Sequence, residues 1–112
     1  MGKLSRDKGV RWELEIAKRL RTIFGDSVKR GFQWRGAEQP DVECPAFWIE
    51  AKHHRRVNIR KSFEQALGDA TADESKRTPV LVCKDDNKRP LVVMDFEDWL
   101  ELIRSWYELS SG

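Results

Sequence analysis

The 112-residue sequence predicts one α/β domain in which helices cover a central mixed β-sheet. Three observations predict this class. Apolar residues recur at helical spacing in three blocks, near the beginning, the middle and the end of the chain. Short runs of alternating or continuous apolar residues, bounded by turn residues, lie between these blocks and predict strands. The resulting order is helix, three strands, helix, two strands and helix, which gives an α/β sandwich.

The charge distribution suggests a surface that meets a polyanion. Residues 1–61 carry 15 Lys and Arg against 8 Asp and Glu, whereas residues 62–112 carry 6 against 11. A basic half and an acidic half suggest that one face is turned toward a polyanion. The alternative stays open, because halves of a sequence need not form halves of a surface.

Hydropathy and cysteine content predict a soluble, cytoplasmic protein. The N-terminus has no hydrophobic signal region, and no apolar run approaches the length that spans a membrane. Cys44 and Cys83 show no metal-binding spacing. Cys83 lies in an apolar run and is expected to be a buried free thiol, although a disulfide between the two stays open.

The first helix is expected to run from Gly9 to Phe24, after a flexible basic arm at residues 1–8. Gly25 follows as the C-cap. At roughly 100° per residue the apolar side chains form one arc. This arc contains Val10, Trp12, Leu14, Ile16, Ala17, Leu20, Ile23 and Phe24.

Glu13 falls inside this apolar arc. A carboxylate there loses hydration at a cost of several kcal/mol unless it is paired or bound to a metal. Two expectations follow: Glu13 forms a buried ion pair with Arg11 or Arg30, or it faces a site built by other acids.

A first strand is expected at residues 27–33, followed by a basic, glycine-containing loop at residues 33–37. Trp34 in this loop could stack on an unpaired base, but a core or dimer-contact role is the stronger expectation for it.

The region from residue 39 to residue 52 is expected to form two short strands joined by a turn. Alternation in the second strand points Glu50 and Lys52 to the same face, and Asp41 opens the preceding strand within reach of them. Two converging carboxylates suit Mg²⁺, which prefers oxygen ligands. A lysine beside them can orient a water or offset charge on a phosphate. The alternative is an ordinary surface pair of Glu50 and Lys52.

The segment after Lys52 is strongly basic. Arg55 and Arg56 are expected to contact phosphates, and the alternative is a solvated basic loop. The second helix is expected to begin near Ser62, which together with Gln65 matches a capping box.

The last elements are two strands and a helix. The strands are expected at residues 78–84 and 91–94, joined by a polar hairpin turn, and the helix at residues 96–109. The helix has one wide apolar face, which is expected to cover the sheet and to contribute to a dimer.

Two short motifs resemble those of known nucleases. Pro40-Asp41, followed after eight residues by Glu50-Ala51-Lys52, resembles the signature of PD-(D/E)XK nucleases. Lys8-Gly9, followed after three residues by Glu13, resembles the N-terminal helix of archaeal-type Holliday junction resolvases. The similarity covers most of residues 6–95 and rests on short motifs and their order. Virus-type replication-repair nucleases share much of this pattern.

The resemblance implies a restriction-endonuclease-like α/β/α sandwich and a Mg²⁺-dependent endonuclease in which Mn²⁺ substitutes. It favours a phage-type Holliday junction resolvase that acts on four-way DNA junctions as a two-fold dimer. Asp41 and Glu50 are expected to hold the metal with help from the Ala51 carbonyl, Glu13 to join the metal site or orient a water, and Lys52 to position the attacking water. The residues expected to hold the DNA are Arg11, Arg30, Arg35, Arg55 and Arg56, and Gln65 is expected to brace the active site unless it only caps the helix.

The sequence leaves two alternative functions open. One is another nuclease of the same fold that cuts duplex, flap or single-stranded DNA. The other is a DNA-binding protein without catalytic activity, although three acids amid lysines and arginines do not suit a surface that only binds phosphate.

Overall fold

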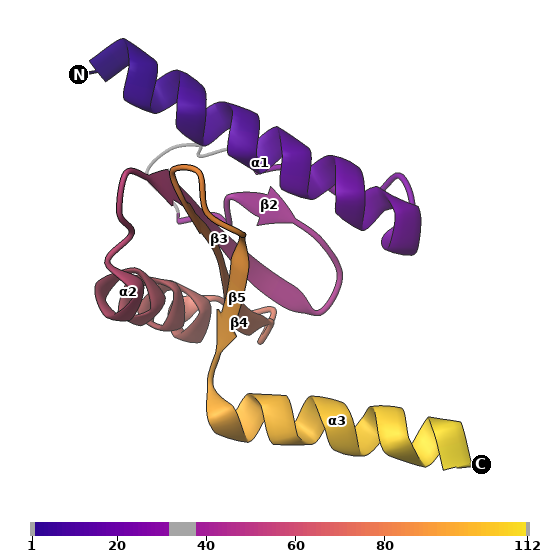
Figure 1. Cartoon of the computed structure of the whole chain (residues 1–112). Helices are drawn as coiled ribbons and strands as arrows, with labels where there is room; N and C mark the ends of the chain where they lie inside the picture. Colours follow the sequence, from indigo (N-terminus) through magenta and orange to yellow (C-terminus); the bar gives the residue numbers. More distant parts are fainter. Residues whose placement is uncertain (1, 32–37, 112) are drawn as a thin grey trace.

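A five-stranded mixed sheet lies at the centre of the computed structural model, which describes residues 2–31 and 38–111 (Figure 1). The elements are α1 (Gly2–Phe24), β1 (Lys29–Arg30), β2 (Val42–Glu43), β3 (Phe47–His54), α2 (Ile59–Ala72), β4 (Thr78–Asp85), β5 (Leu91–Met94) and α3 (Phe96–Ser111). Their order and the mixed sheet confirm the predicted α/β class.

The strands lie side by side in the order of the sequence, from β1 to β5. Only β3 and β4 are parallel, because α2 carries the chain back between them, and the other neighbours are antiparallel. In the parallel pair Glu50 lies opposite Leu81 and Lys52 opposite Cys83. The long strand β3 therefore occupies the middle of the sheet and carries the predicted site residues.

The two faces of the sheet bury different apolar clusters. Under α1, Trp12 and Ile16 pack with Ile49 and other residues of the sheet, and the Trp12 indole N–H donates to the Val82 carbonyl at 3.1 Å. Under α2, a second cluster joins helix and strand residues around Leu81. Because side chains alternate along β3, Glu50 and Lys52 lie on the α2 face.

The first helix begins earlier than expected. Residues 2–8, expected to form a flexible arm, are part of α1. The Lys8 ammonium pairs with both carboxylate oxygens of Asp86, at 2.9 and 3.1 Å, and so ties this end of the helix to the turn after β4. The other end agrees with the prediction, because Gly25 has a φ of 86° and donates its N–H to the Arg21 carbonyl at 2.9 Å.

The predicted capping box of the second helix is wrong. Helix α2 begins at Ile59, and its N-cap is Asn58, whose side chain accepts from the Lys61 N–H at 3.1 Å. Ser62 is buried inside the helix, and Gln65 is exposed on it. Asn58 lies about one turn before the predicted cap, Ser62, and its side chain provides the hydrogen bond that a free N–H group of the first turn needs.

The first strand is shorter than expected and depends on a glycine. The Gly31 N–H that follows β1 donates to the Asp41 carbonyl at 2.7 Å. A Cβ on Gly31 would lie 1.8 Å from the Pro40 carbonyl oxygen, so only glycine allows this approach. The expected loop residues Trp34 and Arg35 lie outside the described residues.

Helix α3 does not cover the sheet, contrary to expectation. None of its residues is buried, and it runs away from the end of β5 so that the C-terminus lies far from the sheet (Figure 1). Both cysteines, Cys44 and Cys83, are buried free thiols. Across residues 2–31 and 38–111, no helix combines the length and the hydropathy needed to cross a bilayer.

Candidate active site

Asp41 is fixed at the point where the β2–β3 hairpin opens. Its backbone N–H donates to the Ile49 carbonyl at 2.8 Å, and its Oδ2 accepts from the Ala51 N–H at 2.8 Å. These two bonds hold the Asp41 carboxyl beside β3. The Glu50 carboxyl lies within hydrogen-bonding reach of it. The predicted convergence of Asp41 and Glu50 is therefore present.

Burial makes both carboxyl groups unusually weak acids. Glu50 is only 5% exposed, and burial together with the nearby Asp41 charge raises the pKa of Glu50 to about 7. Burial also raises the pKa of Asp41 above its ordinary value, and the charge of Glu13 adds to this, although the Ala51 N–H opposes it. Two desolvated acids with too little positive charge nearby are a site prepared for a cation.

Lys52 supplies part of the missing positive charge. Its Nζ lies 3.4 Å from Glu50 Oε2, which agrees with the predicted alternation along β3. The Lys52 side chain is 27% exposed, so its ammonium can also be reached from solvent. Lys52 can therefore contact both the buried carboxyl and a ligand that approaches the site.

Glu13 borders this pair of acids and is held by Arg30. Arg30 Nε lies 2.7 Å from Glu13 Oε1, so of the expected partners the structure selects Arg30. Glu13 is near enough to Asp41 for its charge to raise the Asp41 pKa. Within the described part of the chain, no three His, Cys, Asp or Glu side chains are grouped closely enough to hold a metal ion together. The expected three-acid cluster is thus reduced to two acids, with Glu13 at its margin.

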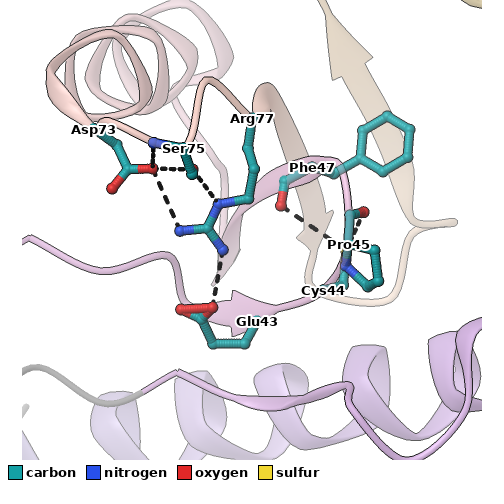
Figure 2. Close-up of polar contacts among 7 residues, drawn as sticks. All are labelled: Glu43, Cys44, Pro45, Phe47, Asp73, Ser75 and Arg77. Carbon is teal, nitrogen blue, oxygen red and sulfur yellow. Dashed lines mark hydrogen bonds and ion pairs between the residues drawn. The ribbon is translucent and has the colours of Figure 1, made fainter.

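A polar network braces the hairpin that carries the acids (Figure 2). Arg77 donates to Glu43 on β2 at 2.8 Å, and Ser75 and Asp73 hold the same guanidinium from the end of α2. The Arg77 guanidinium also lies 5.2 Å from the ring centre of the buried Trp48. The network joins the loop before β4 to the β2–β3 hairpin, and the sequence motifs gave no sign of it.

Comparison with protein-family models gives one match over almost the whole chain. Residues 4–110 match the family described as "Phage putative PDDEXK endonuclease". The chain belongs to this family. Neither the curated proteins nor the solved structures that were compared gave a match to the chain.

Membership of the PDDEXK endonuclease family confirms the resemblance to PD-(D/E)XK nucleases, whereas the catalytic roles of Asp41, Glu50 and Lys52 stay a prediction. It implies a DNA substrate, and nucleases of this superfamily typically depend on a divalent metal. The donors present fit such an ion, because two carboxylates offer the oxygen ligands that Mg²⁺ prefers, and burial, with the charge of a neighbouring acid, raises the pKa of each of them. The Ala51 carbonyl faces the same edge of β3 as the N–H that Asp41 accepts.

The basic residues expected to hold DNA in this endonuclease are distributed around the domain. Arg30 is 43% exposed beside the site despite its pair with Glu13. Arg11 is exposed on α1, and Arg55 and Arg56 are exposed just after β3. Arg35 lies outside the described residues.

Asp69 is an acid near Glu50 that the motifs did not reveal. It lies on α2, half-buried, and its charge contributes to the raised pKa of Glu50. Gln65 stands one turn earlier on the same helix and is exposed, and its bracing role stays a prediction. The spacing of Gln65 and Asp69 could have revealed this acid, because residues four apart on a helix lie on one side of it.

Proposed function

We propose that this phage-type endonuclease is a Mg²⁺-dependent, structure-selective DNA endonuclease and that its substrate is the four-way Holliday junction. The observation that carries the proposal is the pair of half-buried Asp41 and buried Glu50, with the Lys52 ammonium 3.4 Å from Glu50. This arrangement suits hydrolysis of a phosphodiester bond, whose transition state gains negative charge that cations stabilise.

Each residue of the site has its own role in this proposal. Asp41 and Glu50, with the Ala51 carbonyl, would hold the ion, and Mn²⁺ would substitute for Mg²⁺. A divalent ion held there would polarise the phosphate and make a bound water more acidic. Lys52 orients the attacking water and offsets charge on the phosphate. Glu13 orients water from the margin of the site.

DNA binding in this proposal depends on arginines. Arg30 links Glu13 to the DNA backbone, because its guanidinium has further N–H donors beyond the one that Glu13 accepts. The other arginines assigned to backbone contacts are Arg11, Arg35, Arg55 and Arg56. Junction selectivity rests on the resemblance of Lys8-Gly9 and Glu13 to the resolvase helix, and paired nicks in a junction require a two-fold dimer with two sites.

The test is a cleavage panel with a four-way junction, a flap and a linear duplex in Mg²⁺. The wild type should cut the junction in preference. Asp41→Asn should abolish cleavage while junction binding persists or tightens, because one source of repulsion toward phosphate is removed. Glu15→Gln, an exposed carboxyl on α1, is the matched control and should leave cleavage unchanged.

Other outcomes of the panel point to the alternatives. Equal cutting of all three substrates would refute the junction assignment and leave a general nuclease of this fold. Junction binding without cleavage in any divalent metal would indicate a DNA-binding protein. Loss of binding in a folded Asp41→Asn variant would contradict the role given to Asp41.

A further inference from the structure

Helix α3 turns its apolar face away from its own chain. Asp98, Glu101 and Ser105, which lie on one side of the helix, line a hollow with Phe47 and Met94 of the sheet. At roughly 100° per residue the large aromatic side chains fall on the opposite side. These are Phe96, Trp99, Trp106 and Tyr107, which are 64, 44, 65 and 66% exposed. A surface helix normally does the reverse and buries its apolar side.

The sheet has an uncovered apolar area on the face that α1 occupies. Helix α1 packs on β1, β2 and β3, whereas α2 packs on the other face. Beside α1, over β4 and β5, lies a groove of about 540 Å³. Its lining includes Leu20, Phe24, Val80, Val82, Val92 and Met94. Asp41, Glu50 and Lys52 do not line this groove, so it is separate from the candidate active site.

We propose that the groove receives α3 of a second copy of this chain, and that two copies exchange these helices about a two-fold axis. Each copy offers both an unfilled apolar groove and an unpartnered apolar helix, which is the requirement for a closed, self-complementary pair. A helix of 16 residues is about 24 Å long, so it can span the groove.

Helix α3 reaches the border of its own groove through Leu102, whereas none of its four exposed aromatic residues lines that groove. The helix begins directly after β5, and the Asp95 side chain accepts from the Glu97 and Asp98 N–H groups at 2.9 and 3.2 Å. The Asp95 side chain thus caps the first turn of α3, and the helix runs away from the sheet (Figure 1). In this position the aromatic side of α3 does not contact its own groove and is free to enter the groove of another molecule.

The exposed area is large enough for a stable dimer. A buried aromatic side chain removes about 150–250 Å² from water. With roughly half to two-thirds of each exposed, the four aromatics of α3 offer about 400–600 Å² per chain, as much as the largest patch on a typical monomer. The area buried by two helices and the walls of two grooves would exceed the roughly 1,000 Å² expected of a specific interface.

The test measures the mass of the full chain in solution without DNA, so it is independent of cleavage. Light scattering at micromolar concentration should give twice the 13.1 kDa of one chain. Trp106→Glu on α3 and Val92→Glu in the groove should each give monomers. Both positions are exposed, 65 and 66%, so each variant should keep its fold, which circular dichroism checks. Leu4→Glu places the same charge on an exposed apolar residue outside both surfaces and should leave the dimer intact.

Mixing the two variants tests reciprocal exchange. The Trp106→Glu chain keeps an intact groove and the Val92→Glu chain keeps an intact helix, so a mixed pair regains one contact. A tagged Val92→Glu chain should capture Trp106→Glu, while neither variant captures itself. A monomeric wild type, an assembly larger than a dimer, absence of capture in the mixture, or a dimer that Val92→Glu leaves intact would each overturn the proposal. The last result would indicate that two α3 helices pair with each other instead.

Discussion

Glu50→Gln should stabilise the metal-free protein, and the gain should grow with pH. The ordinary pKa of the Glu50 carboxyl is 4.5, and in the folded protein it is about 7. The folded state therefore holds this proton more tightly than the unfolded state does. The free energy of unfolding contributed by this group falls as pH rises from 4.5 through 7, because the charged form must then be accommodated in a buried position.

The difference between these two pKa values corresponds to roughly 3 kcal/mol. Glutamine carries no charge at any pH, so the variant avoids this loss. It also gives up the pair with Lys52, but that ammonium is partly exposed and can be hydrated. We therefore expect a gain of about 2 kcal/mol above pH 7 and no gain below pH 4.5.

The assay is urea unfolding in EDTA at several pH values and fixed protein concentration, with Glu15→Gln as the exposed control. Mg²⁺ should then restore stability to the wild type but not to Glu50→Gln, because a bound ligand stabilises only the state that binds it. A difference between wild type and variant that does not change with pH would refute the reasoning, as would a variant that is less stable at high pH.

Three other results are expected. Apparent Mg²⁺ affinity, measured by calorimetry, should rise as pH increases toward 7 and then level off, because Glu50 must lose its proton to bind the ion. Gly31→Ala should cost roughly 1–3 kcal/mol in urea unfolding and also lower cleavage, because its Cβ would meet a carbonyl oxygen at 1.8 Å and displace the chain that carries the site. Arg77→Met should cost roughly 2 kcal/mol, because Glu43 loses its partner and the cation over Trp48 is removed; an unchanged unfolding midpoint would show that the network is not stabilising.

The convergence of Asp41, Glu50 and Lys52 could be predicted because it depends on local rules. A period of two along a strand fixes which side chains share a face, and a short hairpin returns the chain to the same place. The structure agrees, with the strands paired in register and Lys52 beside Glu50.

What could not be predicted depends on contacts between distant parts of the chain. Residues 2–8 belong to the first helix, and the pair of Lys8 with Asp86 that ties this segment down joins positions 78 residues apart. The partner of Glu13 could be narrowed to two arginines, and only the docking of α1 against β1 selects Arg30. For α3 the pattern revealed an apolar face but not which surface that face meets, because periodicity contains no information about the partner.

The Asp41 and Glu50 carboxyl groups both lie on the short segment that forms the β2–β3 hairpin. Two backbone N–H groups, of Asp41 and Ala51, make the bonds that set the position of Asp41 relative to β3. Closing so short a loop costs little entropy, and no helix has to dock before the bonds form. Substitutions that shift α1 or α3 should therefore leave the spacing of Asp41 and Glu50 unchanged, whereas a shift of α1 would move Glu13. The local backbone bonds of one short hairpin are therefore enough to set the distance between the two acids.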